Sequence, residues 1–156
     1  MSQGAPKDEK LDAKGLRFAV VATRWNAEIV EKLLSATLGE LKACSGAVGD
    51  PYRCDGVFEL APLAARIARK GGIDGIVALG CVIKGETDHY TLLANETTRA
   101  LGQLALELGT NPRPVALTFG VLAVDDEDQA RRRSEKGREF ARACVSQALA
   151  LRAVGD

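Results

Sequence analysis

The stretch that decides the fold is residues 73–89, Ile-Asp-Gly-Ile-Val-Ala-Leu-Gly-Cys-Val-Ile-Lys-Gly-Glu-Thr-Asp-His. Its apolar run Ile76–Ile83 is continuous rather than alternating, which is typical of a strand buried on both faces in a parallel sheet. The run breaks into a polar turn that carries the only histidine of the chain, His89. Ligands of open parallel sheets bind outside the carboxyl ends of the strands, so we expect chemistry at this turn.

The residue types in this turn suit a ligand site. Gly85 lets a ligand approach the backbone closely, and amides that lead into a following helix can bind an anion. A histidine side chain can both donate and accept a proton near neutral pH. A lone histidine is more often a surface or packing residue, but the position of His89 directly after a buried strand keeps the catalytic interpretation open.

Three further apolar segments predict the rest of the sheet. Leu16–Thr23 and Val115–Val124 have the composition of buried strands, whereas Pro51–Cys54 can form only a short or edge strand, because proline donates no ladder hydrogen bond. Helical periodicity is found from the expected N-cap Asn26 to about Ala43, from Pro62 to Gly71, over Leu92–Leu108, and over Asp125–Arg152 with a break at Gly137. Four strands alternating with four helices predict an α/β, flavodoxin-like three-layer sandwich with a four-stranded parallel sheet.

Length and composition predict one domain. The chain has 156 residues, of which 46% are hydrophobic; we expect a flexible polar leader over 1–14 and a single domain over 15–156. The 21 Lys and Arg residues balance the 21 Asp and Glu residues, so no net field would recruit nucleic acid or an anionic membrane. Neither a signal-peptide core nor a long apolar span is present, which predicts a cytoplasmic protein.

The cysteines and the missing motifs exclude several function classes. Cys44, Cys54, Cys81 and Cys144 show neither a CxxC pair nor metal-ligand spacing, so we expect reduced thiols and no metal site. The chain also lacks a P-loop, an N-terminal GxGxxG unit and a GxSxG elbow. Nucleotide hydrolysis and the usual serine hydrolysis are therefore disfavoured.

The loops after the four predicted strands should open on one edge of the sheet. The side chains on or beside these loops are Trp25 and Asn26, Phe58 and Glu59, Lys84–His89, and Phe119. Aromatic faces suit a flat ring, a carboxylate accepts hydrogen bonds from hydroxyl groups, and the turn suits an anion. The sequence thus predicts a small-molecule site at this edge.

Each of these features also has a purely structural interpretation. Glu59 could be a carboxylate stabilised by a helix N-terminus, and Thr87 could be a helix cap. The basic run Arg131–Arg133 could be a solvated helix face paired with the acidic run Asp125–Asp128, or it could supply a guanidinium that binds a phosphate. The residues alone leave these alternatives open.

Several segments of the chain resemble the 6,7-dimethyl-8-ribityllumazine synthase family of riboflavin biosynthesis. The most specific is Ala78–His89, which is very similar to the family's central strand and Gly-Glu-Thr-x-His turn. The other matching segments, in order, are Phe18–Asn26, Gly56–Leu60, Ala94–Glu96, Phe119–Leu122 and Asp128–Ala130. The resemblance extends from about Leu16 to the last predicted helix.

This resemblance implies a cofactor-independent transferase that joins 5-amino-6-ribitylaminouracil to 3,4-dihydroxy-2-butanone 4-phosphate, with loss of phosphate and water. The matching substrate-binding positions would be Trp25, Asn26, Val57, Phe58, Glu59, Cys81, Val82, Ile83 and, from a neighbouring subunit, Phe119. The matching phosphate-binding positions would be Gly85, Glu86, Thr87 and Arg133, and His89 would transfer the proton. No metal is implied.

The family also implies self-association, as a homopentamer or as an icosahedral shell of 60 chains, with riboflavin synthase as a further partner. The chain departs from the family pattern at some positions: Trp25 replaces the usual phenylalanine, Asp55 and Ala61 replace prolines, and the link after Arg133 is shortened to Ser134-Glu135. Two alternatives remain. One is a catalytically weak homologue that holds a flavin or lumazine or forms a shell; the other is an FMN-binding electron carrier, disfavoured because no Ser/Thr-rich loop follows the first strand.

Overall fold

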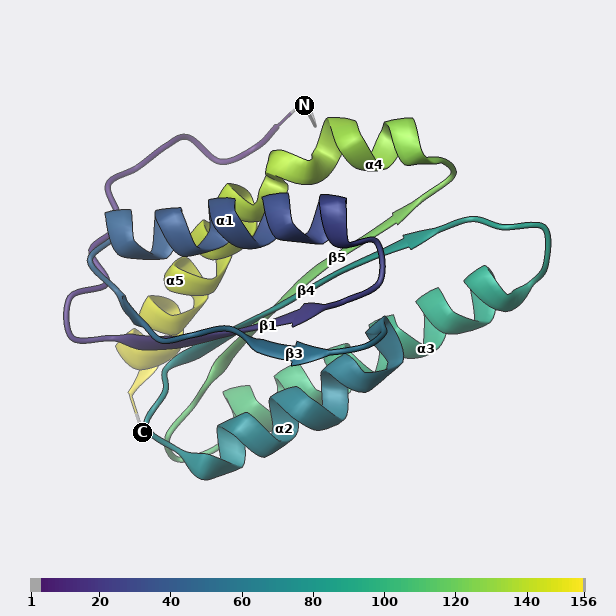
Figure 1. The fold of residues 1–156 in the computed structure, drawn as a ribbon. Coiled ribbons are helices and arrows are strands. Elements are labelled where there is room, and N and C mark those ends of the chain that lie inside the picture. Colours follow the sequence, from purple (N-terminus) through teal and green to yellow (C-terminus); the bar gives the residue numbers. More distant parts are fainter. Residues whose placement is uncertain (1–3, 156) are drawn as a thin grey trace.

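The computed structural model describes residues 4–155 and shows a parallel sheet between two layers of helices (Figure 1). The strands are β1 (Arg17–Thr23), β2 (Ala47–Val48), β3 (Tyr52–Cys54), β4 (Gly75–Ile83) and β5 (Ala116–Val124). The α-helices are α1 (Ala27–Ala43), α2 (Leu60–Lys70), α3 (His89–Gly109), α4 (Glu127–Arg133) and α5 (Gly137–Val154), and the 3-10 turns are η1 (Val57–Glu59) and η2 (Ser134–Lys136). The predicted α/β class with a parallel sheet is confirmed.

The sheet has five strands rather than the four that we expected. Its order is β2-β1-β4-β5, and β3 pairs with β1 on the same edge as β2. The edge is divided because β2 pairs with the start of β1, at Arg17 and Phe18, while β3 pairs with its end. Pro51, which has no N–H to donate, lies in the gap between the two short strands.

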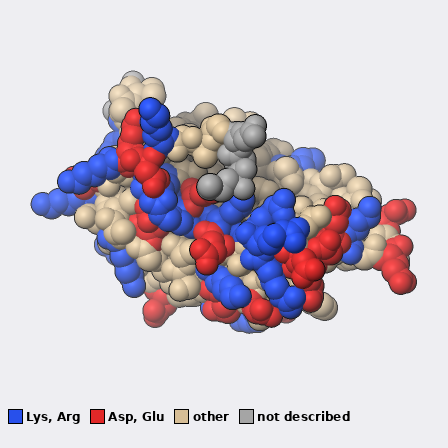
Figure 2. Space-filling model, turned by 90° about the horizontal axis from the view of Figure 1, so that it is seen from above, with Lys and Arg blue, Asp and Glu red and all other residues tan. Residues whose placement is uncertain are grey.

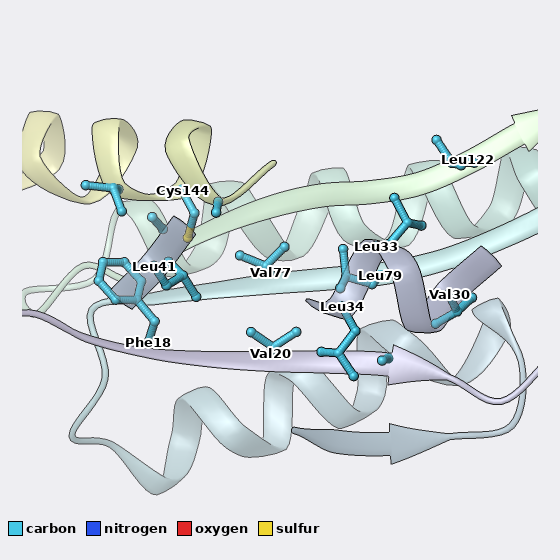
Figure 3. Close-up of a cluster of buried hydrophobic side chains, with 14 of the residues drawn as sticks. Phe18, Val20, Val30, Leu33, Leu34, Leu41, Val77, Leu79, Leu122 and Cys144 are labelled. Carbon is cyan, nitrogen blue, oxygen red and sulfur yellow. The ribbon is translucent and has the colours of Figure 1, made fainter. Parts of the chain in front are cut away.

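Strand β4 is the centre of the fold. It pairs with β1 on one side and, along all nine residues, with β5 on the other. Alternate β4 residues face opposite layers: Val77, Leu79 and Cys81 pack under α1 and α5 (Figure 3), while Ile76, Ala78 and Val82 pack against α2 and α3. Burial on both faces explains why the sequence of this strand is apolar without alternation.

The predicted helices are present, with shifted ends. Helix α1 ends at Ala43 as expected, and α3 begins at His89, three residues before the predicted start. The last predicted helix is divided into α4, η2 and α5, and α5 begins at the expected break, Gly137. A Cβ at Gly137 would overlap the carbonyl group of Leu33 in α1, so a glycine here allows the two helices to cross closely.

The end of the segment that we expected to be a flexible leader packs against the domain. Residues 8–14 contain neither helix nor strand, but Ala13 is fully buried and its backbone N–H donates to the carbonyl oxygen of Cys44 at 2.7 Å. Leu11 packs against the same core. The first three residues of that predicted leader lie outside the described residues.

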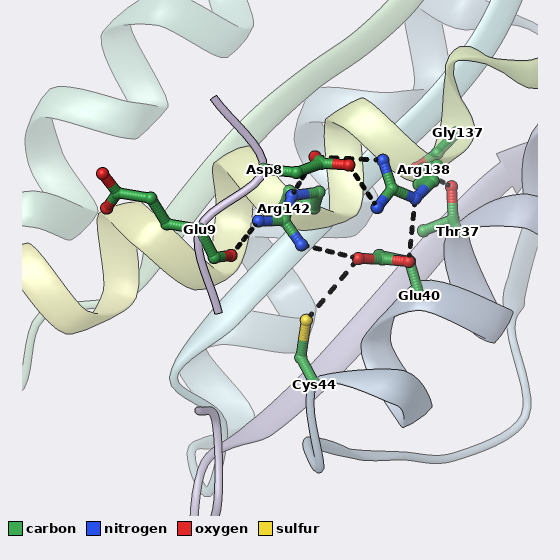
Figure 4. A network of polar contacts seen from close by, with 8 residues as sticks. All are labelled: Asp8, Glu9, Thr37, Glu40, Cys44, Gly137, Arg138 and Arg142. Carbon is green, nitrogen blue, oxygen red and sulfur yellow. Dashed lines mark hydrogen bonds and ion pairs between the residues drawn. The ribbon is translucent and has the colours of Figure 1, made fainter. Parts of the chain in front are cut away.

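A charged network holds this segment to α1 and α5 (Figure 4). The guanidinium of Arg138 donates to the carboxylate of Asp8 at 3.1 Å, which lowers the pKa of that carboxyl group. Arg142 donates to the half-buried carboxylate of Glu40 at 2.9 Å and to the carbonyl oxygen of Glu9. The exposed Asp8 pair contributes little stability in water, whereas the Glu40 pair is partly shielded from solvent.

Charges of both signs cover the face of α1 and α4. Figure 2 shows Lys and Arg side chains interspersed with Asp and Glu side chains over this face. Arg131 of α4, for example, lies 3.7 Å from Glu28 of α1 and 3.4 Å from Glu127. Among the described residues, no helix combines the length and the apolar character needed to cross a membrane.

The crossing of α1 and α5 yields a prediction with opposite outcomes at two glycines. Gly137→Ala should lower the free energy of unfolding by about 2–3 kcal/mol, because the added methyl group meets a backbone carbonyl group that cannot move alone. Gly39→Ala should raise it by up to about 1 kcal/mol, because Gly39 lies exposed within α1 and its Cβ would meet open space. Urea unfolding at one fixed subunit concentration measures both; equal effects would contradict the close crossing.

Candidate functional site

The connections that follow the strands lie at one end of the sheet. In Figure 1 the chain leaves β1, β4 and β5 toward the right-hand end, where α1, α3 and α4 begin. The last residues of β4 and β5 remain paired, and the backbone N–H of Lys84 donates to Val124 at 2.9 Å just beyond them. This is the carboxyl edge of the sheet, where the sequence predicts the site.

The connection after β1 is tied to the connection after β3. The backbone N–H groups of Arg24 and Trp25 both donate to the carbonyl oxygen of Asp55 at 3.1 Å. The guanidinium of Arg24 also donates to the Asp55 carboxylate at 2.9 Å. A Cβ at Gly56 would lie 3.9 Å from Cδ1 of Trp25. The indole ring therefore stands beside the start of the turn that carries Phe58 and Glu59.

Asn26 joins this loop to β4 instead of capping α1 with its side chain. Its backbone is in the left-handed region, with φ 55°, which Asn tolerates better than most residues. Its side-chain amide donates to the carbonyl oxygen of Cys81 at 2.8 Å. Asn26 therefore occupies the expected N-cap position, but the expected side-chain cap is absent because the amide is used across the sheet edge.

One predicted site residue of η1 faces the core, and two face solvent. Val57 is buried in the α2/α3 core, so its side chain cannot reach solvent at this edge. Phe58 is exposed, and Oε2 of Glu59 accepts a hydrogen bond from the backbone N–H of Gly56 at 3.0 Å. One carboxylate oxygen of Glu59 thus has a structural role, because it binds a backbone N–H group at the start of η1. Its other oxygen, Oε1, accepts no hydrogen bond from residues 4–155.

The end of β4 presents backbone rather than side chains. Cys81 and Val82 are buried in opposite layers, and Ile83 is half-buried. Burial raises the pKa of the Cys81 thiol to about 11, so the thiol stays protonated near neutral pH. Any ligand that reaches this segment from the edge meets its peptide groups.

The polar turn after β4 is open to solvent. Gly85, Glu86 and Thr87 are all exposed, and so is His89, the first residue of α3. The backbone N–H of His89 donates to the hydroxyl of Thr87 at 3.4 Å, a long hydrogen bond typical of a weak cap. Thr87 therefore acts as a weak helix cap. The rest of the turn is exposed and can contact a ligand.

Two predicted site residues stand apart from the others. Phe119 lies in the middle of β5, opposite Ala78, and Arg133 ends α4 and donates to the carbonyl oxygen of Gln129 at 3.3 Å. Within the described chain, neither makes a hydrogen bond or ion pair with another predicted site residue. Arg131, by contrast, is held by Glu28, Glu127 and Asp128. The solvated-face interpretation thus fits Arg131 and leaves Arg133 available.

The site is an open surface in one chain. The residues Trp25, Phe58 and Phe119 are 72%, 64% and 40% exposed, so much of each ring is open to solvent in a single chain. Two hollows lie elsewhere, at the β2/β3 edge and beside α2, and none of the predicted site residues lines them. Residues 4–155 contain no cluster of His, Cys, Asp and Glu that could hold a metal ion.

Two residues next to the predicted site were missed from the sequence. Asp55 fixes the Trp25 loop through its backbone carbonyl oxygen, which no sequence pattern reports. Gly80 lies inside β4, and Val57 packs where its side chain would be. A glycine inside an otherwise apolar strand indicates a close approach of another segment, so this signal was present in the sequence.

Comparison with known proteins gives one consistent family. The family model described as 6,7-dimethyl-8-ribityllumazine synthase matches residues 15–152. A protein of that name from Kineococcus radiotolerans is 40% identical, with 97% of this chain and 94% of the relative covered. Its namesakes from Nitratidesulfovibrio vulgaris (40% identical, 87% and 88% covered) and Leifsonia xyli (39% identical, 97% and 96% covered) are similarly close. The chain therefore belongs to the 6,7-dimethyl-8-ribityllumazine synthase family.

Proposed function

We propose that this chain forms 6,7-dimethyl-8-ribityllumazine from 5-amino-6-ribitylaminouracil and 3,4-dihydroxy-2-butanone 4-phosphate, as a step in riboflavin biosynthesis. An amine of the pyrimidine attacks the ketone carbon and a first water leaves, after which phosphate is eliminated. The second amine then attacks the carbonyl carbon that this elimination leaves, and the ring closes with loss of a second water. The observation that carries the proposal is the family membership of a chain whose predicted site segments meet at one sheet edge. The reaction requires mainly that two substrates be oriented and that protons be moved.

The pyrimidine ring would bind between aromatic side chains and the β4 backbone. Trp25 and Phe58 are exposed on neighbouring loops, and the faces of their rings can stack on a flat ligand ring. The peptide groups of Cys81, Val82 and Ile83 can hydrogen-bond the ring edge, and their side chains are largely withdrawn into the core. Val57 would take part only through its backbone, since its side chain packs inward.

The ribityl chain would lie beside Glu59 and Asn26. Oε1 of Glu59 can accept hydrogen bonds from two hydroxyl groups. The Asn26 amide already donates to Cys81, so its oxygen and second N–H are the atoms left for a ligand. These two side chains approach the same edge from different loops, which suits a flexible polyol.

The phosphate would bind at the turn Gly85–Thr87, completed by Arg133. The turn is exposed and leads into the N-terminus of a 21-residue helix, where backbone N–H groups favour an anion. His89 follows directly and would move a proton between the substrate atoms during addition and elimination. A guanidinium on the phosphate would stabilise the charge that the leaving group carries.

The complete site would form between neighbouring chains. Family membership implies self-association, and we propose a homopentamer in which the next chain supplies Phe119 and Arg133. In support, these two residues lie apart from the rest of the site, and the exposed rings have no cover within one chain. A head-to-tail interface closes into a ring when the rotation between neighbours is a whole fraction of a full turn, which for a pentamer is one fifth. A 60-chain shell built from such pentamers is the alternative to a free pentamer, and a cytoplasmic location and riboflavin synthase as a partner belong to the same proposal.

Purified protein supplied with both substrates should form the lumazine, detected by its absorbance. His89→Ala should lower the rate about ten- to a thousandfold, because solvent can partly replace a proton shuttle. The matched control is Asp88→Ala, which changes the neighbouring exposed residue without removing a proton carrier suited to neutral pH. A protein that binds the lumazine but never forms it would instead support the catalytically weak homologue, and an unchanged rate in His89→Ala would remove its assigned role.

Arg133→Ala should raise the KM for the butanone phosphate about ten- to a hundredfold, because a charge-assisted hydrogen bond to the phosphate is lost. The KM for the pyrimidine should change much less. Arg132→Ala is the control, since its side chain is the neighbouring exposed cation and also has no carboxylate partner among the described residues. If Arg132→Ala shows the effect and Arg133→Ala does not, the phosphate contact belongs to a different arginine of the run.

A mixture of two impaired chains tests the shared site, when the butanone phosphate is supplied well below the KM of the Arg133→Ala chain. Glu59→Ala and Arg133→Ala chains, unfolded and refolded together in equal amounts, should regain up to about a quarter of the wild-type activity. The reason is that about a quarter of randomly formed interfaces pair an intact Glu59 with an intact Arg133. Each variant refolded alone is the control. Absence of any recovery in ring-shaped mixed assemblies, checked by light scattering, would place the whole site within one chain.

A further inference from the structure

The packing around Gly80 leaves no room for a side chain, although its backbone conformation would accept any residue. It lies in β4 next to Thr23 of β1, on the face that α2 and α3 cover, and its φ is not positive. A Cβ built on Gly80 would lie 2.7 Å from Cγ1 of Val57 and 3.3 Å from Cγ2 of Thr23. Non-bonded carbons prefer separations of about 3.5–4.0 Å, so a side chain here would displace Val57 by about 1 Å.

Val57 is the inward-facing residue of η1, and the outward-facing residues of the same turn are Phe58 and Glu59. The turn is short and is closed by the hydrogen bond from the Gly56 N–H to the Glu59 carboxylate. It therefore has little freedom to absorb a shift of Val57 internally. Any displacement of the buried methyl group is passed to the exposed ring and the carboxylate.

Cys81, the next residue of β4, is hydrogen-bonded to the loop that follows β1. The carbonyl oxygen of Cys81 accepts the Asn26 amide, so the loop after β1 is fixed to the strand one residue beyond the position where η1 rests on it. Both the loop after β1 and the turn η1 are thus positioned by the β4 backbone at Gly80 and Cys81. The position of Trp25, which stands beside Gly56, depends on the same part of the β4 backbone.

We propose that Gly80 is a positioning residue of this site: its missing side chain forms a notch for Val57, and the depth of that notch sets the distance of Phe58 and Glu59 from the β4 edge. This inference rests on the proposed function, because Phe58 and Glu59 act there on the pyrimidine substrate. Gly80 itself touches no substrate. The proposal predicts a larger effect on the pyrimidine half of the site than on the phosphate half, since within residues 4–155 no hydrogen bond joins η1 to Gly85–Thr87 or to Arg133.

Gly80→Ala should raise the KM for 5-amino-6-ribitylaminouracil about tenfold or more and leave the KM for the butanone phosphate nearly unchanged, because misplacing binding groups by about 1 Å weakens orientation strongly. The double variant Gly80→Ala/Val57→Ala removes the methyl group that clashes. Its pyrimidine KM should return to within about threefold of Val57→Ala alone. No recovery in the double variant, or an equal change in both KM values, would overturn the proposal.

Gly75→Ala is the matched control for general damage. Gly75 begins the same strand, and a Cβ there would lie 2.7 Å from Sγ of Cys144 and 2.8 Å from Phe18, a comparable steric conflict at the opposite end. This variant should lose stability yet keep the pyrimidine KM of the wild type. If Gly75→Ala raises that KM as Gly80→Ala does, the effect reflects loosened packing and the positioning role is removed.

A second variant covers the case in which Gly80→Ala folds poorly, and a fluorescence measurement needs no catalysis. Val57→Ile adds a methyl group on the other side of the same contact and should also raise the pyrimidine KM; an unchanged KM would contradict the notch. Trp25 is the only tryptophan, so its fluorescence should shift in Gly80→Ala and not in Gly75→Ala even if the protein makes no lumazine. An inactive wild type would refute the proposed function alone, whereas unchanged fluorescence in Gly80→Ala would refute the positioning role alone.

Discussion

The pairing of β4 with β1 and β5 is the constraint on which the rest of the molecule depends. A strand that is hydrogen-bonded on both sides and apolar on both faces must be covered by two helix layers. The crossovers that provide these layers leave the carboxyl ends of all strands at one edge. The location of the site is therefore a consequence of how the central strand is buried.

The exact shape of the site is set by hydrogen bonds between loops and not by the sheet alone. Asp55 holds the loop of Trp25 through backbone hydrogen bonds, and Asn26 fixes that loop to Cys81. Each of these contacts is local to the sheet edge, yet the residues are 30 to 55 positions apart in sequence. Three loops that would be mobile individually thus share one rigid support.

The parts of the structure that could be predicted are those with a repeating chemical pattern. Continuous apolar runs identified β1, β4 and β5, and helical periodicity identified α1 and α3 within a few residues. The short edge strand predicted at Pro51–Cys54 is confirmed as β3, whereas β2 was not visible in the sequence, because a strand of two residues is defined by its partner rather than by composition. The packing of residues 8–13 depends on Arg138 and Arg142, 130 residues later, and no local pattern encodes such a contact.

For the site, the sequence identified residue types and the order of the segments, and it could not show how each side chain is used. Asn26 has the composition of a cap and instead bonds to β4; Val57 lies in a matching motif and faces the core. The roles assigned to His89 and Arg133 stay predictions, because they depend on contacts with a substrate and a neighbouring chain that no local sequence pattern encodes. The missing information is the second surface that would cover the exposed rings.

The burial of the four cysteines has a chemical consequence for such a site. All four thiols are free and buried, and burial raises the pKa of Cys54 to about 11 and that of Cys144 to about 12. A thiolate near an electrophilic ketone would add to it reversibly and form a hemithioketal that competes with the attacking amine. Because even Cys81, near the sheet edge, is buried in the core under α1 and α5 and has a raised pKa, the four cysteines would offer a bound ketone little thiolate to compete with the incoming amine.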